Sequence, residues 1–106
     1  MESKIQFANE KIKKAFDKLQ EENLKMYEII LRAFKDIEEN VFCGIQVPKK
    51  LIPKEYFKKF NIKNVWKYNL PDAWRLIYSV EGKNLLILSI VLEWMDNKTY
   101  ERRFKY

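Results

Sequence analysis

The sequence predicts an α+β domain in which a short strand and a helical hairpin precede an antiparallel sheet. Three patterns predict this fold class. Residues 4–7 alternate in polarity, residues 9–41 carry apolar stripes at helical spacing, and residues 65–92 contain three short strand-like segments separated by turn residues. With 106 residues, the chain has room for one hydrophobic core. We therefore expect the whole chain, 1–106, to form one domain whose helices cover one face of the sheet.

The N-terminal part combines the short strand 4–7 with two helices. From Asn9 the apolar period becomes that of a helix, and residues 20–23 interrupt it. This pattern predicts two antiparallel helices within residues 9–41. Their apolar stripes are expected to form core: Ile12, Ala15, Phe16 and Leu19 in the first helix, and Met26, Tyr27, Ile30, Ala33, Phe34, Ile37 and Val41 along the second.

The C-terminal part predicts a short helix followed by a three-stranded meander. Pro53 suits the first position of a helix that reaches Phe60. The last predicted strand is apolar on both faces, as expected of a central strand that is covered on both sides. We expect strands at 65–70, 74–80 and 85–92, hairpin turns at 70–73 and 81–84, and a short helix or ordered tail at 97–106.

The content of cysteine and histidine limits the possible chemistry. The single cysteine, Cys43, excludes an internal disulfide, and we expect it to be a small buried apolar residue. No histidine is present, which excludes histidine-containing metal sites and Ser-His-Asp triads. Any catalysis must therefore use Lys, Arg, Tyr or carboxylate side chains, and we expect neither a metal nor another cofactor.

The sequence also predicts a cytoplasmic protein. Residues 1–11 are polar and charged and do not resemble a signal peptide. The longest apolar run, residues 85–92, is far too short to cross a bilayer. A lone cysteine suits a reducing compartment. We therefore expect no membrane partner.

The positive charge is concentrated in the middle of the chain. Residues 41–70 hold seven lysines and one acid, Glu55, so 7 − 1 gives +6, which equals the net charge of the whole chain. Clustered positive charge with interleaved aromatic rings favours a nucleic acid as partner, and the alternative is a solubilising lysine-rich surface. The lysines are Lys49, Lys50, Lys54, Lys58, Lys59, Lys63 and Lys67, and the aromatic residues are Tyr56, Phe57, Phe60, Trp66 and Tyr68.

Two neighbouring strand motifs resemble the RelE/ParE superfamily of toxins: NVWKYNL at residues 64–70 and WRLIY at residues 74–78. The loop PKKLIPKEY and the ending EWMDNKTYERRFKY are similar to those of archaeal members. The resemblance covers the whole chain in element order and is specific from Gly44 onward. It implies a RelE-like fold and a type II toxin–antitoxin system, in which a cognate antitoxin binds the toxin in a hetero-oligomer.

The resemblance also implies an activity. RelE-type toxins are ribosome-dependent endoribonucleases (mRNA interferases), in which the 2′-hydroxyl of the messenger RNA attacks the adjacent phosphate. ParE-type relatives inhibit DNA gyrase instead, and a third alternative is a catalytically silent nucleic-acid-binding homologue. Asn69 and Asn97 stand where some relatives have lysine and histidine. The predicted catalytic residues are Arg75, Lys67, Tyr100, Lys98 and Arg103, and the predicted RNA-binding residues are Lys49, Lys50, Lys54, Lys58, Lys59 and Arg102.

Overall fold

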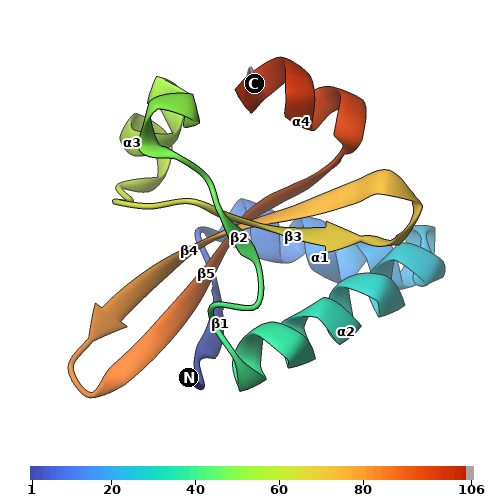
Figure 1. Cartoon of the computed structure of the whole chain (residues 1–106). Coiled ribbons are helices and arrows are strands. Elements are labelled where there is room, and N and C mark those ends of the chain that lie inside the picture. The colour runs from blue at the N-terminus through green and yellow to red at the C-terminus, as the bar shows by residue number, and fades with distance from the viewer. Residues whose placement is uncertain (105–106) are drawn as a thin grey trace.

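The computed structural model describes residues 1–104, in which helices pack against a five-stranded sheet (Figure 1). The α+β class is therefore confirmed, and the predicted tail residues 105 and 106 lie outside the described part. In chain order the elements are β1 (Lys4–Phe7), α1 (Glu10–Glu22), α2 (Leu24–Glu39), β2 (Ile45–Gln46), the 3₁₀ helix η1 (Lys49–Leu51), α3 (Lys54–Phe60), β3 (Trp66–Leu70), the 3₁₀ helix η2 (Pro71–Ala73), β4 (Trp74–Lys83), β5 (Leu86–Asp96) and α4 (Asn97–Phe104).

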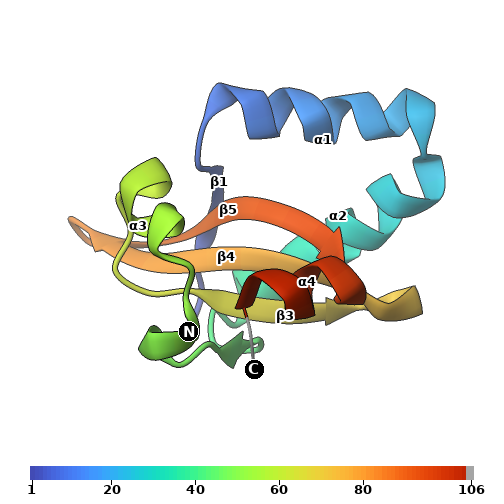
Figure 2. The same ribbon diagram turned by 90° about the horizontal axis from the view of Figure 1, so that it is seen from above.

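The sheet is mixed rather than wholly antiparallel. Its strand order is β1-β5-β4-β3-β2, and β5, β4 and β3 lie side by side in Figure 2. The predicted meander β3-β4-β5 is antiparallel, whereas β1 pairs in parallel with β5, from Lys4 opposite Leu88 to Phe7 opposite Val91. The expectation of a purely antiparallel sheet was wrong, because the alternation of a four-residue strand carries no information about its direction.

The helical hairpin α1–α2 forms the first core against one face of the sheet. Each helix begins at an asparagine whose side chain accepts a backbone hydrogen bond: Asn9 from Ile12 at 3.0 Å and Asn23 from Met26 at 3.2 Å. Asn23 also ends α1, so the predicted break falls at a single residue. The buried residues of this core are Phe16, Met26, Ile30, Ala33, Phe34, Ile37, Val41, Leu70, Leu76, Tyr78 and Val91.

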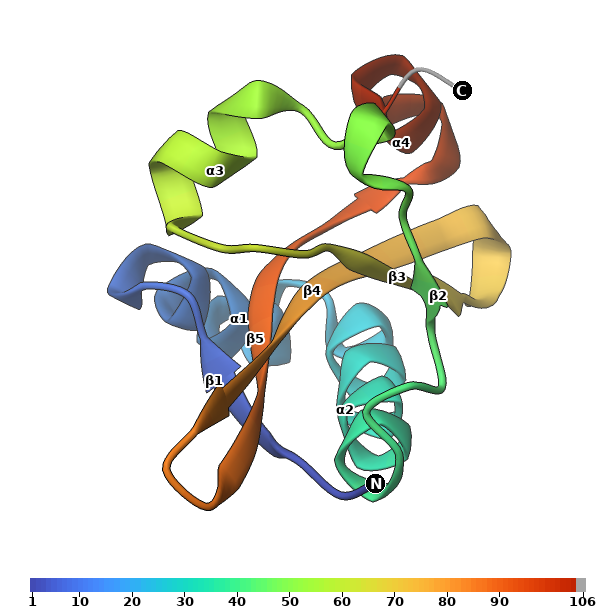
Figure 3. The same cartoon turned by 60° about the vertical axis from the view of Figure 1, so that its left-hand side comes forward.

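The opposite face carries a second core, so the expectation that helices cover one face was wrong. Figure 3 shows α3 and α4 on one side of the sheet and α1 and α2 on the other. The tail forms α4, whose first turn is capped by Asp96, which accepts from the Thr99 N–H at 2.8 Å. Tyr100 and Phe104 lie one turn apart and point into this core, with Val47, Ile52, Tyr56, Ile62, Val65, Ile77, Leu88, Ile90, Leu92 and Met95.

The β4–β5 hairpin is longer than the sequence predicts. Pairing continues to Lys83 opposite Leu86, so the turn comprises Asn84 and Leu85 rather than residues 81–84. Asn84 adopts φ 58°, the left-handed conformation that two-residue hairpins require and that asparagine tolerates. Leu85 at the tip is fully exposed.

Cys43 is exposed, which contradicts the expectation that it is buried. The chain leaves α2 at Asn40, and Val41 takes the buried position while Cys43 lies in the following turn. The Tyr78 hydroxyl donates to the Val41 carbonyl at 2.8 Å and accepts from the Gly44 N–H at 3.2 Å. A Cβ at Gly44 would lie 2.6 Å from the Tyr78 oxygen, so this close approach requires glycine.

Candidate active site

The β3–β4 ladder places three of the polar strand residues on the face that carries α3 and α4. Lys67 lies opposite Ile77, and Asn69 lies opposite Arg75. Ile77 belongs to the core beneath α3 and α4, and strand side chains alternate between faces. Lys67, Asn69 and Arg75 therefore share this face, as the sequence predicts, while Trp66, Tyr68 and Leu70 pack against the helical hairpin.

Arg75 is a half-buried cation without a carboxylate partner among residues 1–104. Two carboxylates on neighbouring segments have other partners, because Asp72 pairs with Lys25 at 3.5 Å and Glu93 pairs with Arg103. Nη1 of Arg75 donates to the Trp74 carbonyl at 3.0 Å, whereas its buried Nε donates to no described atom. An unsatisfied buried donor costs about 1–3 kcal/mol, and because Nε has no accessible surface, only the outer part of the half-buried side chain can meet an anion from solvent.

Lys67 lies against the ring of Tyr100. Its Nζ is 4.8 Å from the ring centroid, a cation–π distance that holds the ammonium group over the sheet. The Tyr100 ring is 1% exposed and stacks on Phe104 with centroids 4.5 Å apart. This buried, stacked position supports a packing role for Tyr100 rather than a role in proton transfer. The packing fixes the position of both α4 and Lys67.

Glu93 of β5, which is not among the predicted site residues, stands at the centre of a polar cluster on the same face. The Tyr56 hydroxyl donates to one carboxylate oxygen of Glu93, and Nη1 of Arg103 donates to the other. Burial, and secondarily the hydrogen bond to Glu93, raises the pKa of Tyr56 well above its usual value, so this hydroxyl remains a donor. The charge of Arg103, a predicted catalytic cation, is thus balanced by Glu93.

A β-bulge accounts for the position of Glu93. Ile77 pairs with Glu93 but Tyr78 pairs with Val91, so Leu92 is an extra residue in β5. Val91 packs against the helical hairpin and Leu92 against the opposite core; regular alternation would return Glu93 to the hairpin side. The bulge instead places Leu92 and Glu93 on one face. Strict alternation in the sequence cannot reveal this reversal.

The other predicted cationic residues lie on elements around this face. Lys49 and Lys50 are in η1, Lys54, Lys58 and Lys59 are in α3, and Lys98 and Arg102 are in α4; all are exposed. Within the described part of the chain, no carboxylate forms an ion pair with any of them. The positive charge of η1, α3 and α4 therefore remains available to an anionic partner on one side of the sheet.

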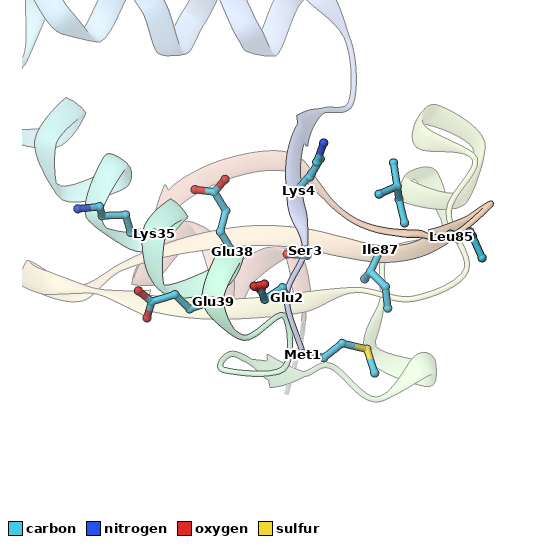
Figure 4. Close-up of a pocket in the computed structure, with 10 residues that line it drawn as sticks. Met1, Glu2, Ser3, Lys4, Lys35, Glu38, Glu39, Leu85 and Ile87 are labelled. Carbon is cyan, nitrogen blue, oxygen red and sulfur yellow. The ribbon is translucent and has the colours of Figure 1, made fainter.

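A cavity of about 980 Å³ lies elsewhere, between the N-terminus, the end of α2 and the tip of the β4–β5 hairpin (Figure 4). Its charged side chains are of both signs: Lys4 and Lys35 beside Glu2, Glu38 and Glu39. This mixture favours no particular ionic ligand. The candidate site therefore rests on the cationic face rather than on this cavity.

Within residues 1–104, no group of three or more His, Cys, Asp or Glu side chains is placed to hold a metal ion. No helix in this part is both long and apolar enough to cross a membrane.

Comparisons with family models, with curated proteins and with solved structures returned no match to this chain.

Proposed function

We propose that this chain is a RelE-like toxin that cleaves messenger RNA on the ribosome with Lys and Arg side chains and without metal. The observation that carries the proposal is Arg75, a half-buried guanidinium with an unpartnered Nε and no carboxylate partner within residues 1–104. It lies on the side of the sheet where η1, α3 and α4 bring exposed cations. A planar, permanently charged guanidinium suits phosphate, which offers several acceptor oxygens.

The proposed reaction is a transfer within the RNA strand. The 2′-hydroxyl loses its proton and attacks the adjacent phosphorus, while the bond from phosphorus to the 5′-oxygen of the next nucleotide breaks. Arg75 stabilises the charge that develops on the phosphoryl oxygens. Lys67, held by Tyr100, donates a proton to the leaving 5′-oxygen. The products are a 2′,3′-cyclic phosphate and a 5′-hydroxyl end.

The exposed cations suit the backbone of a large RNA target. Each lysine or arginine that contacts a phosphate releases counterions, so η1, α3 and α4 supply affinity that does not depend on base sequence. We assign RNA binding to Lys49, Lys50, Lys54, Lys58, Lys59 and Arg102, with Lys98 at the start of α4 beside the site.

We further propose that a cognate antitoxin binds the chain in a cytoplasmic hetero-oligomer. The described residues leave several large apolar side chains exposed, among them Leu24, Phe42, Ile45 and Leu85, with Ile45 on the edge strand β2. An edge strand with unpaired backbone groups and an exposed apolar side chain such as Ile45 can bind a segment of a protein partner.

Primer extension on a translated messenger RNA, run beside a gyrase supercoiling assay, tests the proposal. The purified chain should cut the messenger within its reading frame and leave supercoiling unaffected. Inhibition of supercoiling without cleavage would replace the proposal by the ParE-like alternative. Binding to ribosomes or RNA without either effect would identify a catalytically silent homologue, an alternative that the neutral Asn69 beside Arg75 favours.

A further inference from the structure

The end of the β4–β5 hairpin extends beyond the other strands of the sheet, as Figure 1 and Figure 3 show. Strand β3 begins at Trp66, opposite Tyr78, so within residues 1–104 no strand lies beside residues 79–83 of β4 on that side. On the other side these residues pair with β5 as far as Lys83. The described part of the chain therefore leaves one edge of β4 open.

The backbone groups of this edge point outward at alternate residues. The side chain of Asn64 occupies one outward position, because it accepts from the Val80 N–H at 2.8 Å and donates to the Val80 carbonyl at 2.9 Å. Backbone groups two residues apart on a strand point to the same side, so Gly82 also directs its N–H and C=O away from β5. The turn at Asn84 follows. Between Asn64 and this turn, Gly82 is thus the outward-facing residue that remains open to another chain.

Space for another strand lies beside Gly82. A pocket of about 310 Å³ is lined on one side by residues 79–82 of β4 and on the other by residues 61–64, which lead from α3 into β3. A Cβ at Gly82 would meet no atom within 4 Å beyond its neighbours in the chain, so the described residues do not crowd this position. An unpaired strand edge beside open space is a template for a further strand.

The charged residues on either side of Gly82 are opposite in sign. Glu81 and Lys83 are exposed, and strand alternation places them on the same face of β4. Neither forms an ion pair with another residue in the part of the chain that the structure describes. Lysines alone would make such an edge repel a second copy of itself. A carboxylate and an ammonium placed symmetrically about one residue are instead complementary to themselves under a two-fold rotation.

We propose that two copies of this chain associate through this edge, with their β4 strands antiparallel and Gly82 of one copy opposite Gly82 of the other. Because Asn64 already pairs with Val80, this is the register in which the open backbone groups of both edges meet. The two glycines exchange backbone hydrogen bonds, so the residues beside them lie at the closer of the two cross-strand spacings. Glu81 of each copy is then directly opposite Lys83 of the other, and such pairs stabilise antiparallel strands.

The proposed contact is small and polar. It consists of the hydrogen bonds between the glycines and an ion pair on each side, and the turn of each copy enters the pocket beside residues 61–64 of the other. Interfaces at the low end of the size range belong to transient complexes, so we expect a dimer that exchanges rapidly with the monomer. Salt screens exposed ion pairs, so the dissociation constant of the dimer should rise with ionic strength.

Sedimentation equilibrium of the purified chain, at concentrations up to about 1 mM, tests the proposal. The average mass of wild type should rise with concentration towards that of a dimer. Glu81→Lys and Lys83→Glu each place like charges opposite one another and should weaken the dimer about tenfold or more. The double variant Glu81→Lys/Lys83→Glu restores opposite charges in the same register, so its dissociation constant should return to within about threefold of wild type. Glu28→Lys, the same change of charge at an exposed position on α2, should stay within about twofold.

Gly82 gives a second, independent measurement. Its N–H should exchange with solvent at about half the monomer rate when half of the chains are dimeric, because the dimer protects it. Gly82→Pro removes this donor, which points away from β5 and is not needed for the β4–β5 pairing, and should prevent measurable association. Thermal unfolding shows whether each variant is folded.

Three results would overturn the proposal. A chain that stays monomeric at about 1 mM would show that the charges of this edge protect it from pairing. A dimer whose dissociation constant is the same for wild type, Glu81→Lys and Lys83→Glu would use another surface. A double variant that associates as weakly as the single variants would exclude the register in which Glu81 of one copy faces Lys83 of the other.

Discussion

Asn69 lies directly opposite Arg75 across the β3–β4 ladder. The residue beside the guanidinium is thus a neutral, exposed amide, and the nearest cation of the ladder is Lys67, two residues along β3. The site therefore concentrates less positive charge at the phosphate than two adjacent cations would.

The substitution Asn69→Lys should raise cleavage, because it adds an exposed ammonium beside the phosphate that Arg75 binds. We expect an increase of about tenfold in kcat/KM, or ~1.4 kcal/mol of additional transition-state stabilisation. The like charges of the introduced lysine and Arg75 should cost about 0.2–1 kcal/mol in the free energy of unfolding. Gln6→Lys adds the same charge on the exposed edge of β1 and should change neither quantity appreciably. An equal effect of both variants would show that only net charge matters.

The burial of Tyr100 predicts that its ring matters more than its hydroxyl. Tyr100→Phe should keep the cleavage rate within about threefold of wild type, because the ring still packs on Phe104 and holds Lys67. Tyr100→Ala should lower the free energy of unfolding by about 3–5 kcal/mol. Urea unfolding and single-turnover cleavage separate the two effects. If Tyr100→Phe cleaves about 10²-fold or more slowly than wild type and is equally stable, the hydroxyl of Tyr100 takes part in proton transfer.

The sequence predicts the part of the site that follows regular alternation. Lys67 and Arg75 lie on strands without irregularities at those positions, so a period of two places both on one face. Glu93 was missed because the extra residue Leu92 reverses the alternation, and no turn residue marks the bulge in the sequence. The pairing of Arg103 with Glu93 was not predicted either, because it joins residues on separate elements.

The fold shows the same division between local and long-range information. The two helices, the strand 4–7 and the meander follow from apolar periodicity and from the asparagines that begin each helix. The direction of β1 and the placement of α4 on the second face depend on contacts between distant segments. The helical spacing of Tyr100 and Phe104 is the sequence pattern that indicates α4. The same spacing is also compatible with a tail on the surface. Cys43 lies outside any periodic segment, so no pattern in the sequence predicts that its side chain is exposed.

The bulge within β5 and the hairpin tip that precedes this strand should differ sharply in their contribution to stability. Leu92 is fully buried beneath α3 and α4, whereas Leu85 at the hairpin tip is fully exposed. Leu92→Ala should reduce the free energy of unfolding by about 2–5 kcal/mol, because it removes packed methyl groups and leaves a cavity. Leu85→Ala should change it by less than about 0.5 kcal/mol. Urea denaturation of both variants checks the fold, and equal losses would contradict the position of the hairpin.

The contact between Tyr68 and Asp36 predicts a loss of stability at high pH. Burial, and secondarily the hydrogen bond to Asp36, raises the pKa of Tyr68 to about 12 from its usual value near 10. The folded state thus holds this proton where the unfolded state has lost it. The stabilisation is complete below about pH 10 and disappears as the pH rises towards 12.

Tyr68→Phe should therefore flatten the fall in the free energy of unfolding between about pH 10 and 12, relative to wild type. Tyr56, whose raised pKa arises from burial and from its contact with Glu93 rather than from Tyr68, titrates in both proteins and cancels in the difference. Urea unfolding at several pH values measures this difference. Parallel curves for the two proteins would show that Tyr68 does not hold its proton more tightly in the fold.

The most direct test of the central claim is the cleavage rate of Arg75→Ala on translated messenger RNA, measured by primer extension. Arg32→Ala on the exposed side of α2 is its control, because it removes the same charge from the opposite face. If Arg75 stabilises the phosphoryl transition state, its removal should slow cleavage about 10²–10³-fold, while Arg32→Ala stays near wild type. Unchanged thermal unfolding would show that the fold is intact. Cleavage by Arg75→Ala at the wild-type rate would contradict the assigned site.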